Sequence, residues 1–374
     1  MAKDHNILPI FLEGAIKYEG YTIRHEYDKE LKETLGIVGA QVRRTNAFLQ
    51  LYEALSKVGI YPIVMKGLIC RMLYGNLADH RPSGDEDLLI HHTEYWQTKD
   101  VLIANGYVPE FVDETETQLA QIQEVSFVHP TKKLHLELHL NTMGRENDTR
   151  AKMSDCFKQV FENYREIEIN GVRVRTMNHQ EHLLYLILHA FRHFTSGGFG
   201  IRQMLDILLY LEQYGSEINI NKIYDVLRTF KADTYFSDMI HIGNTYLGFR
   251  LPTVLEKNCP DELLDDMIRS GTFGNKTQAE RTAVATTMSV TEYYGKKRNS
   301  NFLMLVWKSI FPSLKMMQER HPYLTDKPWL LPVEWIKRWG RYFRYNRNAE
   351  GNLAVESMKI SQRRMNLLKK YDLV

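Results

Sequence analysis

The chain has 374 residues, of which 44% are apolar and 25% charged, as in ordinary soluble globular proteins. Lysine and arginine total 48 against 46 aspartates and glutamates, so the net charge of +2 argues against a sequence-wide attraction to nucleic acid or anionic membranes. Three widely spaced cysteines without a CxxC pair argue against a structural zinc site or a disulfide framework. Because there is no leader pattern and no apolar run of about 18 residues, we expect no membrane contact and a cytoplasmic location.

The first part of the chain alternates helical and strand-like segments. Apolar residues at helical spacing predict a helix over 29–58, which a glycine ends. A short buried strand then ends at Gly67, a short helix follows, and a loop rich in turn residues leads to the strand DEDLLI at 85–90. A further helix is predicted to begin at Thr93, its N-cap, and to end near Gly106.

Two more strands, EVSFVH and KKLHLELHL, are joined by a Pro-Thr-Lys turn, and Asn170-Gly171 predicts the tip of a hairpin. From about residue 178 helical spacing dominates, and a length of roughly 150 residues per domain suggests two domains. We therefore predict an α+β protein, with a mixed sheet and flanking helices at 1–177 and an α-helical domain at 178–374. Within the latter, the two prolines of PWLLPVEW predict an irregular crossing.

Two acidic residues, Asp85 and Asp87, are two positions apart in a predicted strand, so their side chains share one face of the sheet. Glu86, Leu88 and Ile90 then face the opposite way. Two carboxylates this close repel each other unless a cation lies between them. Because Mg²⁺ prefers oxygen ligands and is often bound by one or two carboxylates together with substrate phosphates, the pair predicts a magnesium site.

A third acid, Glu137, lies in a later strand between apolar neighbours, where a glutamate is costly to bury without a partner. If this strand lies beside the one that carries Asp85 and Asp87, three carboxylates can converge. Two divalent ions held about 3.5–4 Å apart can activate an attacking oxygen and stabilise a leaving one.

Other interpretations of these residues stay open. Acids at the beginning of a strand are commonly just solvent-exposed. His135, Glu137 and His139 alternate onto one face, and two histidines with one carboxylate could hold iron or zinc. His189 and His193 are four residues apart on a predicted helix but lack the HExxH pattern, which favours core or hydrogen-bonded histidines.

The order of these segments along the chain is a more specific signal than any single segment. It is carried by the segments VMKGLICRMLYG, RPSGDEDLLI, LELHL, LILHAFRH, MLDILLYL and PWLLPVEWIKRW. In these segments the chain resembles bacterial nucleotidyltransferase family 5, the uncharacterised nucleotidyltransferases of the DNA polymerase beta-like superfamily. The resemblance covers roughly residues 30 to 345 and implies a nucleotidyltransferase-like sheet in the first domain.

The resemblance implies that Asp85, Asp87 and Glu137 are catalytic and bind two Mg²⁺ ions, with Mn²⁺ as a substitute. Glu137 would also help to deprotonate an acceptor hydroxyl. The reaction would be attack on the α-phosphate of a nucleoside triphosphate such as ATP, with release of pyrophosphate.

Four further residues are implied in substrate binding: Lys66, Gly67, Arg81 and Ser83. Lys66 would supply a charge to the triphosphate and Gly67 a close backbone approach. Arg81 would grip a phosphate or an acceptor anion, with a structural ion pair to Asp79 or Asp85 as the alternative. The chain has Lys-Gly-Leu where the superfamily usually has a Gly-Gly or Gly-Ser turn, and Glu86 stands where an apolar residue is common.

The leading hypothesis is transfer of a nucleoside monophosphate to a hydroxyl of an unknown small molecule. Transfer to a protein or tRNA is the alternative, and a degenerate nucleotide-binding module is a third, against which the intact acids argue. The near-neutral charge disfavours a nucleic-acid partner. The basic and aromatic segment 335–348 could bind single strands, but it is also typical of an amphipathic helix.

Overall fold

A computed structural model describes the protein at residues 1–19, 28–110, 114–145, 147–270, 311–314, 317–318, 321–325, 327–346 and 353–374. The chain divides into two compact units. The first comprises Met1–Phe191 and Ile201–Glu256, and the second Arg192–Gly200 and Lys257–Val374. Within the described ranges, no helix combines the length and the apolar character needed to cross a membrane.

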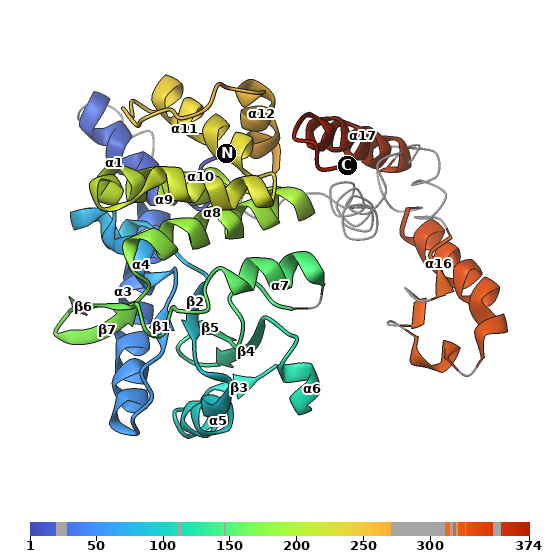
Figure 1. The fold of residues 1–374 in the computed structure, drawn as a ribbon, viewed down its shortest axis with the longest axis horizontal. Coiled ribbons are helices and arrows are strands. Elements are labelled where there is room, and N and C mark those ends of the chain that lie inside the picture. The colour runs from blue at the N-terminus through green and yellow to red at the C-terminus, as the bar shows by residue number, and fades with distance from the viewer. Residues whose placement is uncertain are drawn as a thin grey trace. The chain divides into compact units, whose positions relative to one another are not determined.

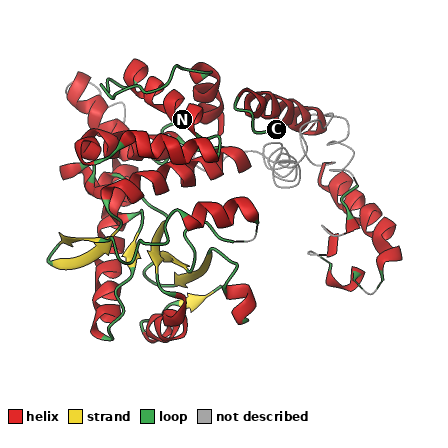
Figure 2. Ribbon diagram, in the orientation of Figure 1, coloured by secondary structure: helices red, strands yellow, loops and turns green. Residues whose placement is uncertain are grey.

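The first unit is built on a seven-stranded mixed sheet, drawn as yellow arrows in Figure 2. The strand order is β3-β4-β5-β2-β1-β7-β6. β2 runs parallel to β5 and antiparallel to β1, and β1 runs parallel to β7. The strands are β1 Ile63–Val64, β2 Asp85–Leu89, β3 Val108–Pro109, β4 Glu124–His129, β5 Leu134–His139, β6 Arg165–Ile169 and β7 Val172–Thr176.

Helices flank the sheet, and Figure 1 shows α9, α10 and α11 gathered on one side of the strands. The helices of the first unit are α1 Leu8–Glu19, α3 Asp28–Lys57, α4 Leu68–Met72, α5 Tyr95–Ala104, α6 Glu116–Leu119, α7 Asp148–Asp155, α8 His179–Ser196, α9 Ile201–Tyr214, α10 Ile220–Thr229 and α11 Asp233–Tyr246. The last five residues of α8 belong to the second unit, as do α12 Pro260–Ser270, α16 Leu331–Asn346 and α17 Leu353–Lys370. The predicted α+β class, a mixed sheet with flanking helices followed by a helical region, is confirmed.

One face of the sheet packs against α3 and α5 to form the core. Leu88 of β2 and Leu136 and Leu138 of β5 are fully buried in the same apolar cluster as Phe48 of α3 and Leu102 of α5. Because side chains alternate across a strand, the residues between them face away from this core. The opposite face therefore carries Asp85 and Asp87 of β2 and His135, Glu137 and His139 of β5.

In the second unit, Arg364 of α17 forms hydrogen bonds with residues of two other helices. Its guanidinium donates to Asp266 Oδ2 of α12 at 2.6 Å and to the Phe194 carbonyl of α8 at 2.5 Å. All three groups lie in the same unit. A buried pair of this kind holds the C-terminal helix in place because neither charge can reach water.

Several local predictions are confirmed. The helix predicted over 29–58 is α3, and the Pro-Thr-Lys turn joins β4 to β5. Asn170 and Gly171 join β6 to β7 with φ values of 50° and 82°, as expected of a tight hairpin turn that needs two left-handed residues.

Two local predictions are wrong. Thr93 does not cap a helix, because a 3₁₀ turn at His92–Glu94 comes first and α5 begins only at Tyr95. PWLLPVEW is not irregular: a 3₁₀ turn at Pro328–Leu330 leads into α16, and the second proline lies in the first helical turn. Proline is tolerated there because its missing N–H has no helical partner in any case. Segment 335–348 is helical as far as Asn346, and its last two residues lie outside the described ranges.

The division into compact units does not coincide with the domains predicted at 1–177 and 178–374. Helices α9, α10 and α11 belong to the same unit as the sheet. Near residue 178 the sequence changes from mixed helical and strand patterns to helical spacing. This change therefore marks a change of secondary structure inside one unit.

A buried histidine predicts how stability depends on pH. His182 of α8 is fully buried, with Nδ1 3.5 Å from Thr176 Oγ1, and burial lowers its pKa from about 6.5 to about 3. Between these values the unfolded chain binds a proton that the folded chain excludes, so stability is lost as pH falls below about 6.5. We expect about 2 kcal/mol less stability at pH 5 than at pH 7 from this residue. Urea unfolding of the wild type and of His182→Gln measures it: the variant should lose less stability between these pH values, and equal losses would contradict the assignment.

Candidate active site

The sheet brings together the acids that the sequence singles out. β2 and β5 are neighbours, with Asp87 opposite Glu137 and Asp85 opposite His135 in the parallel register. Opposed residues of neighbouring strands lie on the same face. Because Leu88 and Leu138 fill the core face, these four side chains lie on the other one. The adjacency on which a three-carboxylate site depends is therefore present.

A compact cluster lies at the centre of this face. One ligand atom each of Asp87, Glu137 and His139 lies within 4.8 Å of the other two, an arrangement that could hold a metal ion. His139 Nε2 is 3.1 Å from Asp87 Oδ1 and 3.6 Å from Glu137 Oε2. Asp87 is fully buried, and its second oxygen, Oδ2, has no hydrogen-bond partner within the described ranges. An unsatisfied buried carboxylate oxygen is the kind of donor that a hard divalent cation takes.

Lys66 places a positive charge against the acids. Its Nζ is 3.0 Å from Asp87 Oδ1, 3.8 Å from Asp85 Oδ2 and 3.3 Å from His189 Nε2 of α8. Burial alone would lower the pKa of Lys66, but the charges of Asp87 and Asp85 outweigh it and hold the pKa well above its usual value. The ammonium is therefore charged at neutral pH and serves as a counter-ion to the two aspartates.

The three clustered groups have shifted pKa values. Burial raises the pKa of Asp87 to about 6, although Lys66 and His139 act to lower it. Burial acts to raise the pKa of Glu137, but hydrogen bonding to His139 and the charge of Lys66 outweigh it and lower this pKa. Burial acts to lower the pKa of His139, yet its contacts with the two carboxylates raise it to about 9. Such opposed shifts in one cluster are typical of functional sites.

Glu86, whose role the sequence leaves open, is a structural residue on the core face. Its Oε2 accepts the N–H of Leu68 at 2.8 Å, and its Oε1 pairs with Arg71 Nη1 at 2.6 Å. Glu86 and Arg71 are both 1% exposed. The carboxylate thus occupies the beginning of α4, the place where an anion is favoured.

The turn before α4 requires a glycine at position 67 because the Glu86 carboxylate lies against the backbone there. Its φ is +55°, and a Cβ built on it would lie 2.2 Å from Glu86 Oε2. The N–H next to it, that of Leu68, donates to Glu86. The turn at Gly67 therefore brings the backbone close to the carboxylate of Glu86, which lies on the face opposite Asp85 and Asp87.

Replacing Gly67 by alanine should destabilise the fold by about 2–4 kcal/mol. A left-handed backbone disfavours any Cβ by about 1 kcal/mol, and displacing the pinned Glu86 carboxylate breaks a charged hydrogen bond. The matched control is Gly59→Ala, since Gly59 has φ +85° but open space around its Cβ position. Urea unfolding of both variants separates the two effects. Equal losses in the two variants would show that Glu86 does not restrict this turn.

Ser83 fixes the loop before β2. Its hydroxyl accepts from Arg71 Nη1 at 2.7 Å and donates to the Asp85 carbonyl at 3.1 Å, and its N–H donates to Gln41 Oε1 at 3.0 Å. The side chain is 4% exposed. These contacts fix the backbone at Asp85.

Arg81 has a buried partner that the sequence does not reveal. Its Nε and Nη2 donate to the two oxygens of Asp206 in α9 at 2.7 and 2.5 Å, and Tyr74 donates to the same carboxylate at 2.9 Å. Neither Asp79 nor Asp85, the partners considered from the sequence, takes this position. Two of the donors that would grip a phosphate are thus occupied by the protein.

Two histidines lie at this site, His139 within the cluster and His189 beside Lys66. His139 was considered as a ligand together with His135, but His135 Nε2 lies 3.7 Å from Glu110 Oε1, and His135 is not part of the cluster. His189, predicted to be a core or hydrogen-bonded histidine, is 6% exposed and contacts Lys66, so that prediction is confirmed. Its contact with Lys66 joins residues 123 positions apart, which no periodicity predicts.

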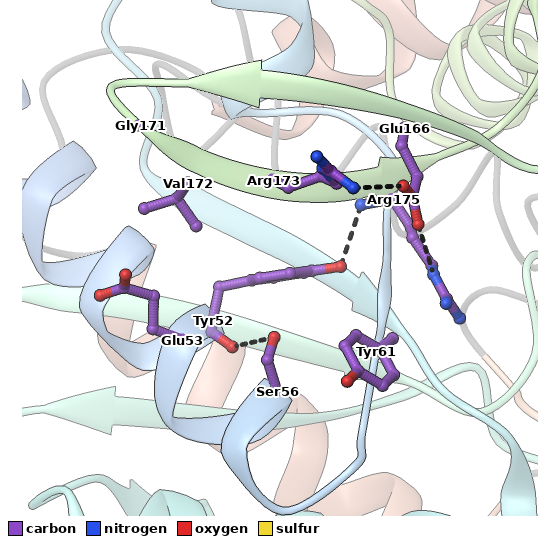
Figure 3. Close-up of a pocket in the computed structure, with 9 residues that line it drawn as sticks. All are labelled: Tyr52, Glu53, Ser56, Tyr61, Glu166, Gly171, Val172, Arg173 and Arg175. Atoms are coloured by element: carbon purple, nitrogen blue, oxygen red, sulfur yellow. Dashed lines mark hydrogen bonds and ion pairs between the residues drawn. The ribbon is translucent and has the colours of Figure 1, made fainter.

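A pocket of about 350 Å³ lies elsewhere in the first unit, between the end of α3 and the β6–β7 hairpin (Figure 3). Its polar groups are largely satisfied by one another. Tyr52 accepts the N–H of Arg175 at 2.9 Å, Glu166 pairs with Arg175 at 3.3 Å, and the Arg175 guanidinium lies over the rings of Tyr61 and Tyr164. None of the predicted site residues lines it.

Comparison with known proteins places the chain in a family. The profile of a family described as uncharacterised nucleotidyltransferase matches residues 1–248. No curated protein matches the chain. A solved structure, an antigenic nucleotidyltransferase-like protein from Paracoccidioides brasiliensis, is 16% identical over 46% of this chain and 76% of that chain, with a TM-score of 0.31. That similarity is too low to support an argument by itself.

Proposed function

Because the chain belongs to the uncharacterised nucleotidyltransferase family, we propose that it transfers a nucleoside monophosphate from a nucleoside triphosphate to a hydroxyl of a small molecule, with Mg²⁺. The observation that carries the proposal is the register of β2 and β5, which sets Asp87 beside Glu137 on one face, two residues from Asp85. In that arrangement these carboxylates would share divalent ions next to Lys66, which contacts both aspartates.

Asp85, Asp87 and Glu137 would hold the divalent ions. Their oxygen donors suit Mg²⁺ or Mn²⁺, and the unpartnered Oδ2 of Asp87 supports the assignment. When bound, such ions neutralise charge that develops on the transferred phosphoryl group and activate the attacking oxygen. His139 would act as a fixed donor that aligns Asp87 and Glu137, since its Nε2 contacts both carboxylates.

The other residues divide into binding and positioning roles. Lys66 would bind the triphosphate as a point charge. Glu137, which is ionised and 21% exposed, would accept a hydrogen bond from the attacking hydroxyl and so orient it. We assign Gly67, Arg81 and Ser83 to positioning, because each is engaged by a buried group of the protein: Glu86, Asp206 and Arg71.

The experiment that tests the proposal is incubation with labelled nucleoside triphosphates, Mg²⁺ and a metabolite extract, followed by mass spectrometry for a nucleotidyl adduct. A small-molecule adduct is expected. Labelled protein or tRNA would instead support the alternative acceptors, and no adduct with any acceptor would favour a non-catalytic nucleotide-binding module. Calorimetry adds a second measurement: because the acids repel a triphosphate, nucleotide affinity should fall in EDTA, and equal affinity would contradict a metal-dependent site.

A further inference from the structure

Helix α16, drawn in orange in Figure 1, exposes an apolar stripe formed by Trp329, Val333 and Ile336. Trp329, in the 3₁₀ turn that leads into α16, is 69% exposed, and Val333 and Ile336 are 42% and 63% exposed. The three residues are spaced by four and three positions, so their side chains lie on one side of the helix. Large apolar side chains gathered on one side of a helix and left in water indicate a surface that another molecule covers.

The other side of α16 packs within its own unit. Trp335 Nε1 donates to the Pro312 carbonyl at 3.1 Å. The rings of Trp335 and Trp339 meet the Phe311 ring edge-on, with ring centroids 5.1 and 4.9 Å apart. Glu334 is 3% exposed. The apolar stripe is therefore not the side by which this helix is held in the protein.

The charge around the apolar stripe is positive. Of the 16 residues of α16, four are basic and one is acidic. The acid, Glu334, is buried and pairs with Lys337 at 2.7 Å, while the Lys337 side chain stays 61% exposed. Lys327, which precedes the 3₁₀ turn, is also exposed. The near-neutral charge of the whole chain, from which we expect no membrane contact, averages over this local excess.

An anionic lipid surface matches both the stripe and the charge. A helix with tryptophan and aliphatic side chains on one side, and with lysine and arginine beside them, buries its apolar side at the boundary between headgroups and acyl chains. Tryptophan is enriched at that boundary. Anionic headgroups in turn attract the basic residues next to it.

Other occupants fit the same surface less well. Single-stranded nucleic acid needs exposed rings on which its bases can stack. Val333 and Ile336 are aliphatic, however, and Trp335 and Trp339 pack against Phe311. A second copy of the chain, docked through the same helix, would bring like charges together.

We infer that this protein binds anionic lipid surfaces through α16, with Trp329, Val333 and Ile336 inserted at the interface and the basic residues of the helix against the headgroups. The helix lies on the membrane and does not cross it. The contact is reversible, because a short stripe buries little apolar area and salt screens the remaining attraction. This property is independent of the nucleotidyl transfer proposed above.

The test is co-sedimentation of the full chain with vesicles of phosphatidylcholine alone and of an equimolar mixture of phosphatidylcholine and phosphatidylglycerol. The stripe variant, Trp329→Gln with Ile336→Gln, removes two apolar side chains at exposed positions. The matched control, Leu35→Gln with Trp96→Gln, removes the same kinds of side chain from α3 and α5, where they are 72% and 48% exposed. Circular dichroism checks that both proteins fold.

The wild type and the control should bind the mixed vesicles and should bind phosphatidylcholine vesicles roughly tenfold more weakly. The stripe variant should lose roughly tenfold or more of the affinity for mixed vesicles. Raising the salt from about 0.1 M to about 1 M should release the wild type, because screening shortens the reach of the charges. Absence of wild-type binding, equal binding to both kinds of vesicle, or equal losses in the control and the stripe variant overturns the inference.

Two further measurements on the same proteins identify the other occupants. Binding of a labelled oligothymidylate that the stripe variant weakens would assign α16 to single-stranded nucleic acid. A wild-type dimer that the stripe variant dissociates in size-exclusion chromatography would assign it to a second copy of the chain. Either result overturns the lipid assignment and leaves the proposed transfer reaction standing, since Asp87→Asn tests that reaction separately.

Discussion

Replacing Asp87 by asparagine should reduce nucleotidyl transfer by about a thousandfold or more, because the change removes several kcal/mol of metal-dependent stabilisation of the transition state. Asparagine keeps the volume of the side chain and loses the charge that holds a divalent cation. The residue is fully buried and contacts both Lys66 and His139, so its carboxylate lies at the centre of the proposed metal site.

The same change should alter the stability of the fold much less than the activity, because two effects oppose each other. Burial raises the pKa of Asp87 from 3.8 to about 6, so the ionised carboxylate costs the folded state free energy at every pH above that value. This cost is on the order of 2–3 kcal/mol, and a neutral isostere avoids it. In turn, the buried Lys66 and His139 lose an anionic partner.

Turnover is measured with an identified acceptor, or with nucleotide hydrolysis as a proxy, and folding by circular dichroism and urea unfolding. Asp100→Asn, at an exposed position of α5, is the control and should leave activity unchanged. Retained turnover in a folded Asp87→Asn protein would mean that Asp87 is a structural partner of Lys66 and His139 and holds no catalytic metal ion.

The sequence predicts those features of the site that follow from the alternation of side chains along a strand. Side chains two apart in a strand share a face, so the common orientation of Asp85 and Asp87, and the opposite orientation of Glu86 and Leu88, follow from the order of the residues alone. The same holds for Glu137 in β5. Their convergence needs the further fact that β5 pairs with β2, which no local pattern contains.

The partners of these residues are less predictable because they come from distant positions. Arg81 and Asp206 are 125 positions apart, and Lys66 and His189 are 123 apart. A helical pattern indicates that residues of α8 or α9 face inward, but it does not say which strand or loop they meet. Glu86 faces the core as alternation predicts, and contacts with Arg71, the Leu68 N–H and the Ser83 hydroxyl make a buried acid acceptable there.

The Arg81–Asp206 pair leads to the second large effect, on stability. Arg81→Met and Asp206→Asn should each destabilise the protein by about 3–5 kcal/mol, since each leaves one buried charge without its partner. Both side chains are about 5% exposed, so water cannot replace the lost contact. Asparagine retains an oxygen that can accept from Tyr74, which confines the change to the charge.

Combining the two substitutions distinguishes a structural pair from a nucleotide-binding arginine. If the pair is structural, the double variant should be more stable than the sum of the single losses predicts, because it contains neither buried charge. If Arg81 instead binds phosphate, Arg81→Met should raise the nucleotide Kd of the folded protein at little cost in stability. The control is Arg228→Met, because Arg228 pairs with Asp225 at 2.7 Å on the surface, where loss of an ion pair costs about 1 kcal/mol or less. Urea unfolding and nucleotide titration of the four variants decide between the two roles: losses of 3–5 kcal/mol that are not additive would make Arg81 the residue that fixes the loop before β2 to α9.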